Sequence, residues 1–92
     1  MTGQHMRVID VATQGVELDF DSARAMAGLL AGKVMADAMV VAWYDGAAGK
    51  GHPDASECTD KPGWLAYAES HGGELRVNIN HHEYVFIFAS AV

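Results

Sequence analysis

The stretch Tyr84-Val-Phe-Ile-Phe-Ala89 decides the fold, because it is apolar or aromatic at every position. A short run without a polar face predicts a strand that is covered on both sides. Just before it, apolar and polar residues alternate from Leu75 to Asn80, which predicts a strand with one exposed face. The polar segment Asn80-His-His-Glu83 between them is typical of a hairpin turn. Residues 75–89 are therefore expected to form a β-hairpin within a sheet.

Other segments are expected to join this hairpin in the sheet. Ala38 to Tyr44 reads AMVVAWY, a continuous apolar run that predicts a strand buried on both faces near the sheet centre. Met6 to Ala12 is rich in β-branched residues and predicts another strand. Val16 to Phe20 alternates apolar and acidic side chains, as a half-buried strand does. Residues 6–20 form one bent strand or a hairpin, and the pattern leaves both open.

Two segments have helical character. From about residue 22 to residue 36, apolar side chains recur at helical spacing and form one stripe. Its N-cap is expected to be Asp21 or Ser22, whose side-chain oxygen accepts the free N–H groups of a first turn. Small residues would let this helix lie close against a sheet: Ala27, Gly28, Ala31 and Gly32. A shorter helix is predicted from about residue 63 to residue 71, and Gly72-Gly73 stops it.

Together these patterns predict a small α+β domain. Residues 1–92 form one unit in the order β(β)αβ–loop–αββ, with four to five strands in an antiparallel or mixed sheet. The loop is residues 46–63, which contain four glycines and both prolines. A connection of this length is uncommon in a compact domain, so it is the first segment to search for chemistry.

Composition limits the classes of function. Twelve acidic residues stand against six basic ones, and the formal charge of −6 disfavours binding to nucleic acid or to anionic membranes. The single cysteine, Cys58, excludes an internal disulfide, which in so small a domain indicates a reducing, cytoplasmic setting. Met1 to Met6 show no signal-peptide pattern. Residues 1–5 are expected to be disordered or a cloning remnant before a start at Met6, and they are given no functional weight. The apolar stretch 23–42 is interrupted by charges and does not predict a membrane span.

Several short segments together resemble a known family. They are Met39 to Asp45, Glu57-Cys58, Pro62-Gly-Trp64, Tyr67, His71 to Val77 and Tyr84 to Ile87. Through these segments the chain resembles a family of short prokaryotic proteins classed as a domain of unknown function. The resemblance extends from about Asp19 to Phe88. The resemblance implies a single α+β domain. It implies no activity, substrate, cofactor or catalytic residue.

The loop contains five residues of the types that bind metal: His52, Asp54, Glu57, Cys58 and Asp60. Imidazole, thiolate and carboxylate groups bind Zn²⁺ and similar divalent metals, and His71 at the end of the short helix is a sixth candidate. Against a metal site, the spacing matches no standard pattern, because paired cysteines and paired histidines at helical spacing are both missing. The plainer interpretation is a hydrated polar loop.

Cys58 is also a candidate nucleophile. It precedes the short helix, whose N-terminus lowers a thiol pKa, and His52 would act as the base with Glu57 or Asp54 orienting it. The carboxylates of Glu57 and Asp60 flank the thiol and would raise its pKa, which opposes the effect of the helix. No second cysteine is present to resolve a disulfide. A buried, unreactive Cys58 is the plainer interpretation, because free cysteine is among the most buried residue types.

Aromatic side chains form another candidate site. A pocket for a ligand or partner would be lined by Trp43, Trp64, Tyr67 and Tyr84. The plainer interpretation is that these rings belong to the core. His81, His82 and Glu83 are expected to be exposed in the hairpin turn. The glycines at 46–51 lack the full phosphate-loop pattern, so nucleotide binding there is excluded.

These patterns favour a binding module over an enzyme. The leading hypothesis is a small intracellular domain without catalytic activity that self-associates, most simply as a homodimer, and binds a protein or a small molecule. Its basis is the apolar strand at 84–89, which one main helix covers on one side, so that a second subunit would complete the cover. The alternative is a metal- or thiol-dependent activity in the loop, centred on His52, Glu57 and Cys58.

Overall fold

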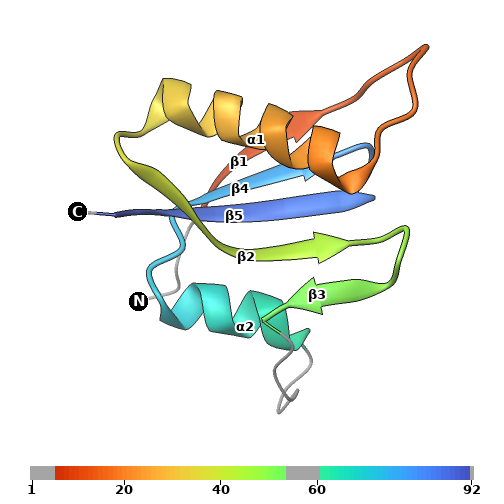
Figure 1. The fold of residues 1–92 in the computed structure, drawn as a ribbon. Coiled ribbons are helices and arrows are strands. Elements are labelled where there is room, and N and C mark those ends of the chain that lie inside the picture. Colours follow the sequence, from red (N-terminus) through yellow and green to blue (C-terminus); the bar gives the residue numbers. More distant parts are fainter. Residues whose placement is uncertain (1–5, 54–60, 92) are drawn as a thin grey trace.

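The computed structural model describes residues 6–53 and 61–91. These residues form five strands and two helices, and neither helix is long and apolar enough to cross a membrane. The elements are β1 (Arg7–Val11), α1 (Phe20–Val34), β2 (Ala38–Asp45), β3 (Lys50–His52), α2 (Gly63–Ser70), β4 (Leu75–Ile79) and β5 (Tyr84–Ser90). The predicted α+β class is confirmed, with the order βαββαββ. α1 covers one face of the sheet and α2 the other (Figure 1).

The sheet is mixed and has the strand order β1-β4-β5-β2-β3. β5 lies at its centre, antiparallel to both β4 and β2. β1 pairs with β4 in parallel, with Ile9 opposite Val77. β1 and β2 consequently run in the same direction, with α1 as the crossover and the β4–β5 hairpin inserted between them (Figure 1). The run at Ala38–Tyr44, predicted near the centre, therefore lies one strand from the edge.

The sheet face under α1 holds the larger part of the core. Alternate residues of β4 and β5 face this side, and Val77 and Phe86 lie opposite each other, fully buried. Phe20, the first residue of α1, packs its ring against Phe86 with centroids 5.4 Å apart and against Trp43 at 4.6 Å. These ring contacts fix the start of the helix over β5 and β2.

α1 lies on the sheet through a row of alanines. Ala23, Ala27 and Ala31 follow one another at the spacing of one helical turn and are fully buried. Gly28 and Gly32, which the sequence pattern groups with them, face away, because a Cβ added to either would have nothing within 4 Å. The close approach of helix and sheet therefore depends on alanines, which keep full helix propensity.

α2 covers the opposite face of the sheet. Val85 and Ile87 of β5 are buried on this side and pack with Ala42 of β2 and Ala68 of α2. β5 is thus buried on both faces, as its apolar run predicts. Because both covers belong to this chain, the strand gives no reason to expect a second subunit, and a dimer needs another basis.

The beginning of α1 differs from the sequence prediction. Its N-cap is Asp19, and not Asp21 or Ser22, because the Asp19 carboxylate accepts the backbone N–H of Ser22 at 2.8 Å. That hydrogen bond is also the main cause that lowers the pKa of Asp19 below its ordinary value. Residues 16–19 lead into the helix, so the strand predicted at Val16–Phe20 is not formed and β1 is a single short strand.

The predicted long loop at 46–63 is interrupted by a strand. Lys50–His52 form β3, which pairs antiparallel with Trp43–Asp45 of β2. Residues 46–49 are therefore the turn of a β-hairpin. The prediction was wrong here because three residues, one of them glycine, are too few to show the alternation that marks a strand.

Candidate functional site

The two described histidines that were candidate metal ligands lie on opposite faces of the sheet. His52 is opposite Trp43 in the β2–β3 register and stacks on that ring at 5.4 Å, which places it on the α1 side. His71 follows α2 on the other side and stacks on Tyr67 at 3.8 Å. Its Nδ1 also lies 2.9 Å from the Tyr67 carbonyl oxygen. The sheet therefore separates His52 from His71.

The other candidate ligands, Asp54, Glu57, Cys58 and Asp60, lie outside the described residues. Within residues 6–53 and 61–91, no three His, Cys, Asp or Glu side chains are close enough together to hold a metal ion. A metal or thiol site would therefore need the undescribed part of the loop, and it stays a prediction. His81 and His82 are exposed in the β4–β5 turn, as expected.

The four aromatic candidates are divided between the same two faces. Trp43 and Tyr84 belong to the α1 side, where the Phe20 ring lies 4.6 Å and 6.2 Å from them. Trp64 and Tyr67 belong to α2 on the other side. One pocket does not join all four rings, so a ligand site must be sought where other side chains meet one of them.

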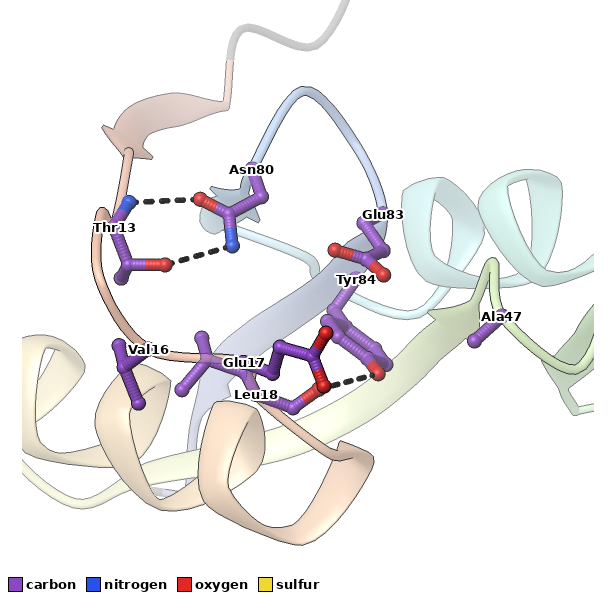
Figure 2. Close-up of a pocket in the computed structure, with 8 residues that line it drawn as sticks. All are labelled: Thr13, Val16, Glu17, Leu18, Ala47, Asn80, Glu83 and Tyr84. Atoms are coloured by element: carbon purple, nitrogen blue, oxygen red, sulfur yellow. Dashed lines mark hydrogen bonds between the residues drawn. The ribbon is translucent and has the colours of Figure 1, made fainter.

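Such a place is a cavity of about 380 Å³ at the end of the sheet where β4 turns into β5 (Figure 2). Its wall combines the segment before α1, the turn after β2 and the beginning of β5. The lining residues are Thr13, Val16, Glu17, Leu18, Ala47, Asn80, Glu83 and Tyr84. The volume falls within the range of about 300–1,000 Å³ that is usual for small-molecule sites.

Asn80 ties two distant segments together at this cavity. The backbone N–H of Thr13 donates to Asn80 Oδ1 at 2.8 Å, and Asn80 Nδ2 donates to Thr13 Oγ1 at 2.9 Å (Figure 2). The backbone N–H of Asn80 also donates to the Val11 carbonyl at 2.8 Å. Asn80 has a φ of 52°, a left-handed conformation that asparagine tolerates better than most residues. The β4–β5 turn and the segment after β1 therefore form one rigid wall.

Tyr84 forms the inner wall of the cavity. Its side chain is 3% exposed, and its hydroxyl donates to the Leu18 carbonyl at 3.1 Å. Burial is the main cause that raises the pKa of this phenol, and the negative charges of Glu83, Asp45 and Asp19 raise it further. These carboxylates make the electrostatic potential negative at this end of the sheet.

The Tyr84 hydroxyl should stabilise the fold in a pH-dependent way. We expect Tyr84→Phe to lower the unfolding free energy at neutral pH by about 1 kcal/mol, because the Leu18 carbonyl loses its donor. The raised pKa means that the folded protein holds the phenolic proton more tightly than the unfolded chain does. Stability should therefore decrease as the pH rises above about 10, the ordinary tyrosine pKa.

Urea unfolding from neutral pH to about pH 11 measures the loss of stability at neutral pH and its dependence on pH. The alkaline loss of stability should be smaller in Tyr84→Phe than in the wild type, because the variant lacks the phenol. Tyr67→Phe is the matched control, since Tyr67 lies on the exposed side of α2. It should keep the wild-type pH profile. An identical alkaline loss in all three proteins would contradict the role given to Tyr84.

The fold and the cavity together define a small α+β domain in which a five-stranded mixed sheet supports a polar, acidic cavity at one end. The chain belongs to the family described as a domain of unknown function, DUF5619, whose model matches residues 6–88. This confirms the family resemblance of the sequence. No function is known for this family, so membership assigns no activity to the cavity.

A solved structure has the same fold. The crystal structure of AF1514, a protein from Archeoglobus fulgidus DSM 4304, matches this chain with a TM-score of 0.78 and 28% identical residues. The match covers 96% of this chain and 98% of the archaeal one. No curated protein matches the sequence. The function must therefore be argued from the geometry of the site.

Proposed function

We propose that this domain is a binding module and that the cavity beside Tyr84 is its ligand site. The observation that carries the proposal is the lining, in which Glu17 and Glu83 contribute carboxylates and, among the described residues, no basic side chain takes part. A ligand with a positive charge is complementary to such a wall. The ligand class that fits is a small organic cation with an ammonium or guanidinium group.

The remaining lining residues fit the carbon part of such a ligand. Val16, Leu18 and Ala47 add apolar surface beside the carboxylates. Val16 is a large apolar side chain that is mostly exposed, which is explained if a ligand covers it. The cavity is close to the lower size limit of small-molecule sites, and this favours a compact ligand. The net charge of −6 would also attract cations toward the protein.

The proposal is tested by calorimetric titration with ammonium, quaternary ammonium and guanidinium compounds of similar size, and with carboxylates as negative controls. At least one class of cation should bind, and Glu83→Gln and Glu17→Gln should each weaken it about tenfold or more, which corresponds to about 1.4 kcal/mol. Glu74→Gln is the matched control, because this exposed glutamate precedes β4 at the opposite end of the strand. Equal affinity in Glu83→Gln and the wild type would contradict the proposal.

Self-association is a second candidate function, and the sheet edge formed by β1 favours it. Among the described residues β1 pairs only with β4, so its outer backbone groups are available to another strand. Val8 in this strand is 51% exposed. A second copy that paired along β1 would continue the sheet across a two-fold axis and cover Val8.

Sedimentation velocity over a range of concentrations tests the dimer. We expect a concentration-dependent dimer for the wild type and a shift toward monomer in Val8→Lys, because a charge on an edge strand opposes pairing. Leu29→Lys, which changes an exposed residue of α1 away from this edge, is the control and should keep the wild-type behaviour. A wild-type protein that stays monomeric at high concentration would exclude self-association.

A further inference from the structure

A polar network crosses the α2 face of β1 and β4. The alternating pattern of β4 predicts that Asn78 faces water, yet this side chain is only 5% exposed. Its Oδ1 accepts a hydrogen bond from Arg76 Nε at 2.8 Å, and its Nδ2 donates to Asp10 Oδ1 at 3.0 Å. Both ends of the amide are used, so Asn78 holds a fixed orientation and positions the arginine.

An aromatic platform holds the same arginine from a second side. The guanidinium carbon of Arg76 lies 5.9 Å from the centre of the Trp64 ring. Tyr44 stacks on Trp64 with centroids 5.5 Å apart and planes 17° from parallel. Gly51 of β3 leaves the space that the indole occupies, because a Cβ at that position would overlap the ring. Trp64 is therefore fixed between two strands and α2, and it offers Arg76 a rigid surface.

The rest of the guanidinium has no protein partner in the described structure. Within residues 6–53 and 61–91, the hydrogen bond to Asn78 and the contact with the Trp64 ring are the direct contacts of the guanidinium, while Asp10 and Glu69 act on it only through their charges. The two Nη groups therefore keep their N–H donors, arranged as the planar fork that binds a carboxylate through two parallel hydrogen bonds. Burial is the main cause that lowers the pKa of Arg76, so this cation has already lost part of its water shell.

Nearby carboxylates are engaged by other groups. Asp10 accepts the Asn78 amide, and Glu69 of α2 forms an ion pair with Lys61. Both carboxylates are close enough to raise the pKa of Arg76, which partly opposes the effect of burial. In the described structure neither forms an ion pair with Arg76. Neutral partners hold the guanidinium in place, and its charge, partly offset by Asp10 and Glu69, has no ion-pair partner among the described residues.

We propose that Arg76, positioned by Asn78 and Trp64, binds the carboxylate of a small organic acid on the α2 face of the sheet. The fork geometry suits a planar carboxylate. A phosphate, with its larger negative charge, would be repelled more strongly by Asp10 and Glu69 and by the net charge of −6. This site is separate from the cavity beside Tyr84 and does not depend on the function proposed for that cavity.

The test uses NMR titration of the ¹⁵N-labelled protein with acetate, benzoate and inorganic phosphate at constant ionic strength. A carboxylate should shift the side-chain signals of Arg76 Nε and Trp64 Nε1 more than those of the exposed Arg7 and Arg24. Phosphate should bind more weakly than the carboxylates. Equal shifts at all arginines would show unspecific ion binding, and tighter binding of phosphate would overturn the ligand class.

Variants separate the fork from the charge. Arg76→Lys keeps the charge but removes the planar fork, so carboxylate affinity should fall at least tenfold, whereas Arg7→Lys should leave it unchanged. If Arg76→Lys does not fold, the signal shifts of the wild-type protein still decide the question. Glu83→Gln should bind carboxylates like the wild type, which keeps this result distinct from that of the cation cavity. Full affinity in a folded Arg76→Lys would overturn the proposal.

Discussion

Phe86→Ala should lower the unfolding free energy by about 3–5 kcal/mol, a large part of the total stability of a small domain. Phe86 is fully buried at the centre of β5, opposite Val77 on one neighbouring strand and Trp43 on the other. Its ring also lies 5.4 Å from that of Phe20 at the start of α1. Removing the ring would leave a void bordered by two strands and a helix, and such a frame cannot collapse to fill it.

Urea unfolding followed by tryptophan fluorescence measures this effect, because Trp43 is next to the site of the change. Leu29→Ala is the control: Leu29 is 68% exposed on α1, and its removal should change stability by no more than about 0.5 kcal/mol. If Phe86→Ala does not fold, Phe86→Leu keeps the test open, with a smaller expected loss. A Phe86→Ala protein as stable as Leu29→Ala would mean that β5 is not the centre of the core.

The importance of Phe86 can be predicted from the sequence, because it depends on a local pattern. The run Tyr84–Ala89 has no polar face, and a strand of this kind must be buried on both sides wherever it lies. The alternation before it and the helical stripe at 22–36 are local in the same sense. The structure confirms a helix and two strands at these three segments. The face of β4 that the alternation predicts to be exposed is covered, however, since Asn78 is only 5% exposed.

Other parts of the fold depend on contacts between distant segments, which no local pattern reveals. The hydrogen bond between Asn78 and Asp10 joins residues 68 positions apart, and it accompanies the parallel pairing of β1 with β4. β3 is a strand because Trp43–Asp45 offers it an edge, and not because of its own composition. The burial of the second face of β5 is a further example. The helix α2 is short, and it covers this face only because Trp64 and Ala68 pack on the sheet.

The candidate sites also include residues that a local sequence pattern suggests and residues that only contacts between distant segments bring together. His52 and His71 are the residue types that suggest chemistry in a sequence, and the sheet lies between them. The residues that line the cavity, among them Thr13 and Glu17, look like ordinary polar residues of a turn until Asn80 brings the segments together. Arg76 looks like an exposed residue of a half-buried strand, and only the folded chain shows it held beside Trp64.

The second large effect concerns the contact between α1 and the sheet, where Ala27→Leu should cost about 1–3 kcal/mol. Ala27 is fully buried in the middle of the alanine row that faces β4 and β5. The additional carbon atoms of leucine have no space there, so α1 would have to move away from the sheet or the side chain would adopt a strained rotamer. Thermal and urea unfolding of the variant measure the loss.

The neighbouring position should respond in the opposite direction. Gly28→Ala places a Cβ where nothing lies within 4 Å and removes the helix-propensity cost of glycine, so it should stabilise the protein by up to about 1 kcal/mol. Consecutive residues of a helix are about 100° apart around its axis, and the opposite signs therefore test which side of α1 faces the sheet. A stabilising Ala27→Leu together with a destabilising Gly28→Ala would mean that α1 is rotated about its axis, because the glycines would then form the contact and the alanine row would face solvent.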